Sequence, residues 1–404
     1  MEKQKNIPQL RFPEFKGEWE SIKLGDYISI TSGNSPSLYD LSDEGIYPFL
    51  KVEELNNCDK YQINSRFYTN DSKNLIEENS IIFPKRGAAI LINKIRINAV
   101  PAQMDSNLMA IKPNNENLNH EFLFYVINKE KLYKIADTST IPQINNKHIE
   151  PYRFYIPKRD EQIKIATFFT SIDQKITQLK RKKTLLEQYK KGVMQKIFSQ
   201  EIRFKDDNGQ EFPKWEKKRL GEVLIEHKTV NSENRFNEVF SVAKHKGVIN
   251  QIEHLGRSFS AKDISNYKVI NPHDIVYTKS PTSDFPFGII KQNLLDRSGV
   301  VSPLYGVFKP ETNALGFLLH NFFLSWINTY NYLNPLVQKG AKNTMNINND
   351  DFLNGAKIPL PVSEVEQTKI ANFLSAIDNK INHIQKQIEK VEVWKKGLMQ
   401  QMFV

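Results

Sequence analysis

The residues whose side chains could bind a partner lie in two polar loops and two basic turns. The loops, 138–157 and 340–361, combine small hydroxyls with amides. Such groups can contact base edges and phosphates, but they also favour ordinary turns, so composition leaves both interpretations open. Each basic turn follows a short apolar run. The candidate nucleic-acid contacts are Lys85, Arg86, Ser139, Thr140, Gln143, Asn145 and Lys147 in the first half, and Lys279, Ser280, Thr282, Lys342, Asn343, Thr344 and Asn346 in the second.

Sequence signatures of catalysis are missing. There is no G-x-G-x-x-G or phosphate-binding loop, no H-E-x-x-H pair, and no Asp/Asn/Ser-Pro-Pro-aromatic motif of the kind found in adenine and cytosine methyltransferases. Asp207, Glu216 and Lys218 can be forced onto a nuclease pattern, which arises by chance in a chain rich in Lys and Glu. The single cysteine, Cys58, rules out a disulfide framework and a cysteine-based zinc site. We expect no catalytic residue, metal or cofactor in this chain.

The positive charge of the chain is concentrated in one segment. The net charge is +10, and residues 157–200 hold 11 Lys and Arg against 4 Asp and Glu. This excess fits a polyanionic partner or, equally, a solvated lysine-rich helix. The first residues contain no apolar run of the signal-peptide type, and the longest apolar stretch, near 317–327, is too short to cross a membrane. We therefore expect a cytoplasmic protein.

The elements that must position these residues occur twice. Residues 161–198 read EQIKIATFFTSIDQKITQLKRKKTLLEQYKKGVMQKIF, and residues 366–403 read EQTKIANFLSAIDNKINHIQKQIEKVEVWKKGLMQQMF. Their apolar residues recur at 4-3-4-3 spacing, which is typical of a coiled coil. Lys183 and Lys190 interrupt the first stripe, and Lys395 interrupts the second. The first helix leaves one globular region and enters the other, so pairing along its length predicts antiparallel helices. The alternative is two helices packed into separate bundles.

The segments outside the helices predict mixed structure. Short apolar runs cut by Gly, Pro, Asn and Asp indicate strands and turns, and each region also has one helix-like stretch, 119–136 and 313–330. The predicted fold class is α+β, with two pseudo-repeated globular domains separated by a long antiparallel two-helix coiled coil. The predicted boundaries are 1–156 and 201–359 for the globular domains, and 157–200 and 360–404 for the helices.

The order of these motifs resembles that of a known family. Two variable regions each precede an E-Q-x-x-I-A…I-D…I helix that ends in K-K-G-x-M-Q. A related opening comes before each region, RFPEFKGEWESIKLG at 11–25 and RFKDDNGQEFPKWEKKRLG at 203–221. This arrangement is similar to the specificity subunits of type I restriction–modification enzymes, over essentially the whole chain. The second opening is longer than the first.

The resemblance implies a function in DNA methylation and phage defence. Each globular region would be a target recognition domain that reads one half of a bipartite double-stranded DNA site. The coiled coil would set the spacer and dock two methyltransferase subunits, which bind S-adenosylmethionine. Two restriction subunits, ATP-dependent translocases that use Mg, would complete the complex, and this chain would have no catalysis of its own. The alternatives are a self-contained DNA-modifying enzyme and a coiled-coil adaptor without DNA binding.

Overall fold

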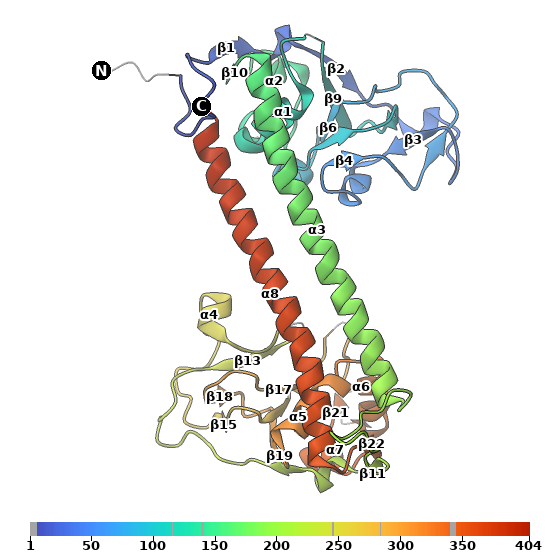
Figure 1. The fold of residues 1–404 in the computed structure, drawn as a ribbon, viewed down its shortest axis with the longest axis vertical. Helices are drawn as coiled ribbons and strands as arrows, with labels where there is room; N and C mark the ends of the chain where they lie inside the picture. Colours follow the sequence, from blue (N-terminus) through green and yellow to red (C-terminus); the bar gives the residue numbers. More distant parts are fainter. Residues whose placement is uncertain (1–5, 115, 139–140, 245, 283, 340–344) are drawn as a thin grey trace. The chain divides into compact units, whose positions relative to one another are not determined.

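The computed structural model describes residues 6–114, 116–138, 141–244, 246–282, 284–339 and 345–404. The chain divides into two compact units, one of Met1–Lys182 with Ile384–Val404 and the other of Lys183–His383. Each unit contains one globular domain and one part of each of two long helices (Figure 1). These helices are α3 (Arg159–Phe198) and α8 (Glu364–Met402).

The first globular domain is built on a five-stranded sheet in the order β2-β9-β6-β7-β4. Its strands are β2 (Ile28–Ser32), β9 (Leu108–Pro113), β6 (Ile81–Pro84), β7 (Arg96–Asn98) and β4 (Tyr61–Gln62). A second sheet joins β5 (Tyr68–Thr69), β3 (Tyr47–Leu50) and β8 (Gln103–Met104), and β1 (Glu20–Lys23) pairs with β10 (Arg153–Ile156). The helices are α1 (His120–Glu130) and α2 (Asn146–Ile149).

Strand β6 shows why this sheet has two buried faces. Ile81, Ile82 and Phe83 are all 0% exposed. Because successive side chains of a strand point to opposite faces, Ile81 and Phe83 join the core formed with α1, whereas Ile82 joins a second core with Met104. The continuous apolar run in the sequence therefore reflects burial on both sides.

The second domain has a four-stranded sheet in the order β12-β19-β16-β17. Its strands are β12 (Leu224–Glu226), β19 (Gly306–Pro310), β16 (Ile275–Tyr277) and β17 (Ile290–Gln292). Four two-stranded pairs accompany it: β11 (Glu216–Lys218) with β22 (Ile358–Leu360), β13 (Phe240–Ala243) with β14 (Gly247–Asn250), β15 (Lys268–Ile270) with β18 (Gly299–Val301), and β20 (Gln338–Lys339) with β21 (Met345–Asn346). The helices are α4 (Gln251–Leu255), α5 (Asn313–Phe322), α6 (Trp326–Leu333) and α7 (Asn349–Leu353).

The two domains share one framework. The sheet order β2-β9-β6-β7 corresponds to β12-β19-β16-β17, and the pair β1–β10 corresponds to β11–β22. Helix α1 follows β9 as α5 follows β19, and α2 precedes β10 as α7 precedes β22. Short 3₁₀ helices lie between these elements: η1 (Leu24–Asp26), η2 (Pro36–Leu38), η3 (Val52–Asn56), η4 (Ala88–Ile90), η5 (Leu132–Lys134), η6 (Leu220–Glu222) and η7 (Asn334–Leu336). The predicted α+β class with two pseudo-repeated domains is confirmed.

The stretch 313–330, expected to be one helix, forms two. Helix α5 ends at Phe322, and α6 begins after Ser325. The Ser325 hydroxyl accepts a hydrogen bond from the Asn328 backbone N–H at 3.3 Å, which caps the second helix. A capping serine inside an apolar stretch therefore divides it.

Helices α3 and α8 pair in opposite chain directions within each unit. In the first unit, Asp173 pairs with Lys395 and Lys180 pairs with Glu392. In the second unit, Lys190 pairs with Asp378, and Ile197 packs near Ile370 and Leu374. As residue numbers rise along α3, those of its partners on α8 fall. The helices are thus paired and antiparallel, and not parts of separate bundles.

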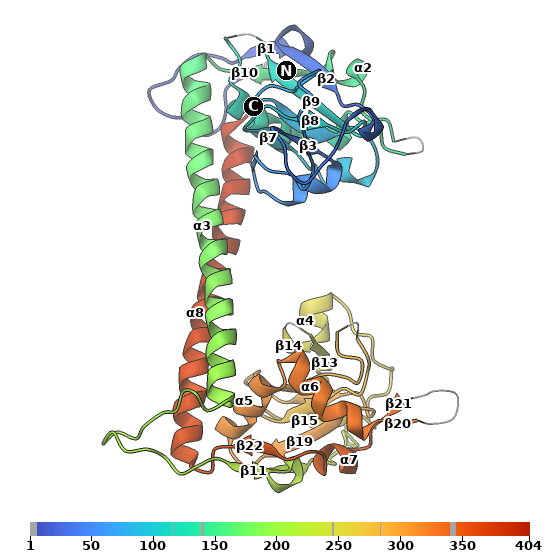
Figure 2. The same ribbon diagram turned by 90° about the vertical axis from the view of Figure 1, so that its right-hand side faces the viewer.

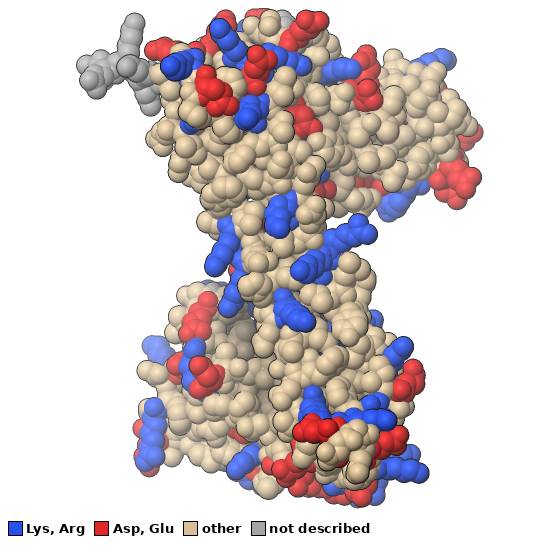
Figure 3. Space-filling model, in the orientation of Figure 1, with Lys and Arg blue, Asp and Glu red and all other residues tan. Residues whose placement is uncertain are grey.

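Two of the three lysines that interrupt the apolar stripes form ion pairs across the helices, whereas the third, Lys183, pairs with Glu187 of its own helix. Lys190 of α3 pairs with Asp378 of α8, and Lys395 of α8 pairs with Asp173 of α3. Both lysines belong to the K-K-G motif and both aspartates to the I-D motif of the repeat. Most other lysines of the helices are exposed, and Figure 3 shows Lys and Arg side chains gathered over the middle part of α3 and α8.

The repeated Glu-Gln pair at the start of each helix fixes the chain around it. Arg11 Nε and Nη2 donate to the two carboxylate oxygens of Glu161 at 2.8 and 2.7 Å, and Arg203 donates to Glu366 at 3.3 Å. The neighbouring glutamines hold the preceding loops through backbone carbonyls. Glu161 is 2% exposed and Glu366 is 0% exposed. These motif residues are therefore structural, and they attach each opening segment to its helix.

Candidate nucleic-acid interface

The structure joins the two segments of the first domain that were predicted to contact DNA. Arg86 and Gln143 form an antiparallel β-bridge. The Ile144 backbone N–H donates to the Lys85 carbonyl at 2.9 Å, and the Gly87 N–H donates to the Pro142 carbonyl at the same distance. The turn after β6 and the polar loop before α2 therefore form one surface, although more than 50 residues of chain separate them.

The basic turn presents one exposed and one half-buried cation. Gly87 has φ +84°, a conformation that suits glycine and lets the chain turn directly after Arg86. Arg86 is exposed and Lys85 is half-buried. Burial, followed by repulsion from Arg86, lowers the pKa of Lys85. A phosphate beside these side chains would relieve that repulsion, so the turn suits an anionic partner.

Two other predicted residues belong to helix α2. Asn145 is its N-cap residue, and its backbone N–H donates to His148 Nδ1 at 3.1 Å. Lys147 is exposed on the same helix. Asn145 thus has a position in helix capping that explains its residue type without DNA. Ser139 and Thr140 lie outside the described residues.

In the second domain the predicted residues begin at the end of β16. Lys279 follows this strand with φ +57°, and burial, followed by repulsion from Lys268, lowers its pKa. The Ser280 hydroxyl donates to the Thr278 carbonyl at 3.3 Å. Thr282 Oγ1 accepts from the Phe285 N–H at 3.2 Å and closes a turn. These hydroxyls stabilise the loop that presents the lysine.

The second polar loop is described only at its ends. Asn346 lies in β21 opposite Gln338 of β20, a pair visible in Figure 2. Lys342, Asn343 and Thr344 lie outside the described residues. The bridge between Asp137 and Gln143 precedes α2 in the first domain, and the β20–β21 pair precedes α7 in the second. Because α2 and α7 are equivalent, the bridge and the strand pair correspond. Of the predicted residues that the structure describes, Arg86 and Lys279 therefore follow equivalent strands, and Gln143 and Asn346 precede equivalent helices.

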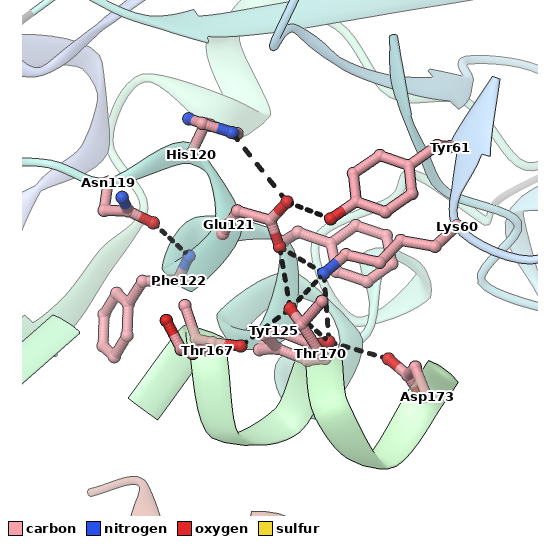
Figure 4. Close-up of polar contacts among 12 residues, drawn as sticks. Lys60, Tyr61, Asn119, His120, Glu121, Phe122, Tyr125, Thr167, Thr170 and Asp173 are labelled. Atoms are coloured by element: carbon pink, nitrogen blue, oxygen red, sulfur yellow. Dashed lines mark hydrogen bonds and ion pairs between the residues drawn. The ribbon is translucent and has the colours of Figure 1, made fainter. Parts of the chain in front are cut away.

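Sequence reasoning missed a buried polar cluster between the first globular domain and helix α3 (Figure 4). Lys60 donates to Thr170 Oγ1 at 2.7 Å, to the Tyr125 hydroxyl at 3.1 Å and to the Glu121 carboxylate. Tyr125 donates to Asp173 at 2.7 Å. The cluster joins the chain just before β4 to α1 and α3, and Asp173 extends it to α8 through Lys395.

The charges of this cluster are matched. Burial opposes ionisation of Glu121, but hydrogen bonds from Lys60 and Tyr61 overcome it and lower the pKa of this carboxyl. Burial and the Asp173 charge raise the pKa of Tyr125, so its hydroxyl stays protonated and donates. The cluster therefore fixes the first domain to the helices. Ala314 and Leu318 stand where Glu121 and Tyr125 stand in α1, so the second domain does not repeat this arrangement.

A basic groove of about 850 Å³ lies beside this cluster. Of its acidic side chains, Asp173 is paired with Lys395 and Glu392 with Lys180. Its third acidic side chain is Asp59, and its remaining cations are Arg96, Lys129, Lys131 and Lys396, together with Lys60 of the cluster. The groove therefore has a net positive charge.

Two searches of the described part of the chain were negative. No group of three or more His, Cys, Asp and Glu side chains in that part is arranged to hold a metal ion. None of its helices combines the length and apolar character needed to span a membrane.

Two domains with one shared framework, each followed by one of two paired long helices, define a duplicated α+β protein. A family model described as the type I restriction modification DNA specificity domain matches residues 16–188 and again residues 213–393. The chain therefore belongs to this family, and it is a specificity subunit of the type I restriction–modification class.

Relatives and solved structures agree along nearly the whole chain. The type I restriction enzyme MjaVIII specificity subunit of Methanocaldococcus jannaschii is 28% identical, covering 98% of this chain and 93% of the relative. The putative MjaX specificity subunit of the same organism is 24% identical, covering 98% and 95%. The crystal structure of the type I restriction-modification system S subunit from M. genitalium has a TM-score of 0.60 at 14% identity, covering 98% and 99%. It supports the fold.

Proposed function

We propose that the chain reads a bipartite double-stranded DNA site, with one half-site for each globular domain. The observation that carries this proposal is the shared framework: equivalent strands β6 and β16 end in basic turns, and equivalent polar loops precede α2 and α7. Residue types in these loops differ between the domains. A constant scaffold with different loops suits two different target sequences, because base readout depends on the individual donors and acceptors presented.

In this proposal the long helices set the spacer and dock two methyltransferase subunits. Those subunits bind S-adenosylmethionine and methylate adenine, and two restriction subunits supply ATP- and Mg-dependent translocation and cleavage. The chain itself contributes recognition and no turnover, in the cytoplasm. Nonspecific DNA affinity comes mostly from phosphate neutralisation. The residues before the first helix are close to electrically neutral, so weak DNA binding by the isolated chain is expected.

A domain exchange tests modular readout. Residues 20–155 are replaced by the equivalent region of another specificity subunit, and methylated adenines are mapped in the host genome. One half-site should change while the other and the spacer stay. If both half-sites change in a chain that still folds and assembles, the domains do not read independently.

The alternative of a self-contained DNA-modifying enzyme has its own assay. The purified chain is incubated with DNA and S-adenosylmethionine, with and without the methyltransferase subunit. Methyl transfer should need the added subunit. Transfer by the chain alone, with contaminating methyltransferase excluded, would favour the enzyme. If the chain with the added subunit does not protect DNA in a sequence-selective way, the chain is an adaptor.

A further inference from the structure

An exposed aromatic residue follows helix α1 in the first domain and helix α5 in the second. Tyr133 is 38% exposed, and Trp326, the first residue of α6, is 48% exposed. The two residues have the same position when counted without a gap from the helix N-caps, Asn119 and Thr312. Single exposed rings are common on protein surfaces. Recurrence at one position of a duplicated framework is different, and it indicates a shared use.

A matching hydrogen bond inside each helix supports this correspondence. Asn128 Nδ2 donates to the Phe124 carbonyl at 3.1 Å in α1, and Asn321 Nδ2 donates to the Phe317 carbonyl at 2.8 Å in α5. These bonds lie at the same distance along the chain from the two N-caps. The helices are therefore in register, and the two exposed aromatic residues are equivalent.

In the second domain, a series of contacts ties the exposed ring to the basic turn. Trp326 stacks on Tyr330 with ring centroids 5.3 Å apart, and Tyr330 packs on Phe287 at 5.5 Å. The Phe287 carbonyl accepts a hydrogen bond from the Tyr277 hydroxyl at 2.7 Å. Tyr277 is the last residue of β16, just before the turn that presents Lys279. The ring of Trp326 is therefore held close to the edge where the predicted DNA contacts begin.

In the first domain, Asn93 makes the equivalent connection. It lies just beyond η4, the short helix that follows the basic turn at Arg86. Its Oδ1 accepts from the Leu132 N–H at 2.8 Å, and its Nδ2 donates to the Ile127 carbonyl at 3.4 Å. Leu132 directly precedes Tyr133. The chain after the basic turn thus holds the segment that presents the exposed ring.

The chemistry of these rings beside a basic turn suits the surface of a DNA duplex. Thymine methyl groups and deoxyribose are apolar, and they lie next to charged phosphates. Tyr and Trp likewise combine an apolar ring with one donor, an O–H or an N–H, which can reach a phosphate oxygen. In the first domain a cation accompanies the ring, since Lys131 Nζ lies 6.0 Å from the centroid of Tyr133.

We propose that Tyr133 and Trp326 make apolar contacts with DNA, each in the half-site read by its own domain. Each ring packs on a thymine methyl group or a deoxyribose beside the group held by the basic turn. The inference rests on the proposed function, and it adds one contact residue to each domain. Because Tyr330 already orients the ring of Trp326, binding costs little side-chain entropy there.

Alanine substitutions in the assembled complex test the two rings. Tyr133→Ala and Trp326→Ala chains are combined with the methyltransferase subunits, and binding is titrated on a duplex that contains both half-sites. Each should weaken binding by about tenfold or more, which is the effect of exposing one large apolar side chain. Each should also relax selectivity in one half-site only, and the two half-sites should differ. Trp326→Phe, which keeps an aromatic ring, should retain most of the affinity.

The matched controls are Ile63→Ala and Ile225→Ala, which remove apolar side chains that are 51% and 73% exposed. Both lie away from the basic turns. Ile225 pairs with Lys309, whereas the end of β16 pairs with the opposite end of β19 at Gly306. Ile63 follows β4, whose neighbour β7 pairs with the start of β6. We expect both controls to bind DNA as the wild type does.

Two further measurements define the contact. An apolar contact releases no counterions, so the loss should be the same at low and high salt, whereas the loss from a missing phosphate contact shrinks as salt rises. Replacing each thymine by deoxyuridine removes one methyl group at a time. If one replacement weakens the wild type but not Trp326→Ala, the ring lies on that methyl group. If no replacement matters, the ring lies on deoxyribose.

The outcomes separate the two proposals. A wild-type complex without sequence-selective binding overturns the proposed function and the inference with it. Selective binding that Tyr133→Ala and Trp326→Ala leave unchanged overturns the inference alone. A loss that shrinks with salt, an equal loss in the controls, or loss of bound methyltransferase subunits in native mass spectrometry also overturns it. In those cases the effect belongs to charge, to folding or to a protein interface.

Discussion

Lys190 Nζ lies 2.8 Å from both carboxylate oxygens of Asp378, on the apolar stripe that joins α3 to α8. The Lys190 side chain is 11% exposed and that of Asp378 is 33% exposed. The equivalent pair in the first unit, Lys395 with Asp173, has the roles of the two helices exchanged. A charge on an apolar stripe is costly unless it meets its partner, so each pair fixes the register of the two helices.

Breaking this pair should destabilise the protein more than removing both charges. We expect Asp378→Asn to lower the free energy of unfolding by about 1–3 kcal/mol, because it leaves a largely buried ammonium without its counter-charge. The double variant Lys190→Met with Asp378→Leu should lie within about 1 kcal/mol of the wild type. Denaturant unfolding measures both. As a control, Glu187→Gln in the exposed Lys183–Glu187 pair should change stability by about 0.5 kcal/mol or less. Equal losses in the single and double variants would contradict a charge-pairing role.

Arg86 and Lys279 should contact DNA in the assembled complex. Arg86→Ala should cost about 1–3 kcal/mol of binding and relax one target position if the contact is to a base, whereas loss of a phosphate contact should weaken all sequences alike. Lys279→Ala should act in the same way on the other half-site. Binding titrations on matched and mismatched duplexes, with methylome mapping, separate the two effects. Lys23→Ala, in β1 and outside the predicted loops, is the control. Unchanged affinity and methylation pattern in both variants would refute the loop assignment.

The buried charge of Lys291 in β17 should lower the free energy of unfolding at neutral pH. It is 3% exposed, and burial, followed by repulsion from Lys190, lowers its pKa to about 8 from 10.5. Below pH 8 this lysine is protonated in both the folded and the unfolded state, so folding bears the full cost of burying the charge. Between about pH 8 and 10.5 the folded state releases the proton first and stability rises.

A neutral side chain of similar length removes this cost. We expect Lys291→Met to raise the free energy of unfolding at pH 7 by about 1–3 kcal/mol. The difference between variant and wild type should shrink as the pH approaches 10, as seen in thermal or denaturant unfolding at several pH values. A gain that does not change with pH would mean that packing, and not charge, is responsible.

The helices should act as a ruler between half-sites. A heptad added to each helix, near Lys180 and near Gln385, keeps the apolar stripe and lengthens each helix by about 10.5 Å. That length corresponds to about three base pairs, which also rotate one half-site by roughly a third of a turn. We expect a spacer longer by about one to three base pairs with both half-site sequences unchanged. Methylome mapping of the engineered strain measures the spacer length. An active variant with the original spacer would show that the helices do not set the distance between half-sites.

The sequence by itself determined the helices, the duplication and the α+β class. The 4-3-4-3 stripe is a local pattern whose physical meaning, an apolar face of a helix, does not depend on the rest of the chain. Likewise, the repeated Glu-Gln and K-K-G motifs mark equivalent places in the two halves before any contact is known. The missing catalytic motifs are equally local, and they directed the interpretation toward recognition.

Only the tertiary structure decided what the exceptions to these patterns do. Lys190 and Lys395 look like interruptions until the opposite helix supplies an aspartate. Lys60 and Glu121 are 61 residues apart, so no periodicity could pair them. The turn at Arg86 and the loop at Gln143 become one surface through a backbone bridge. In each case the partner is distant in sequence, and side-chain type alone cannot choose among distant partners.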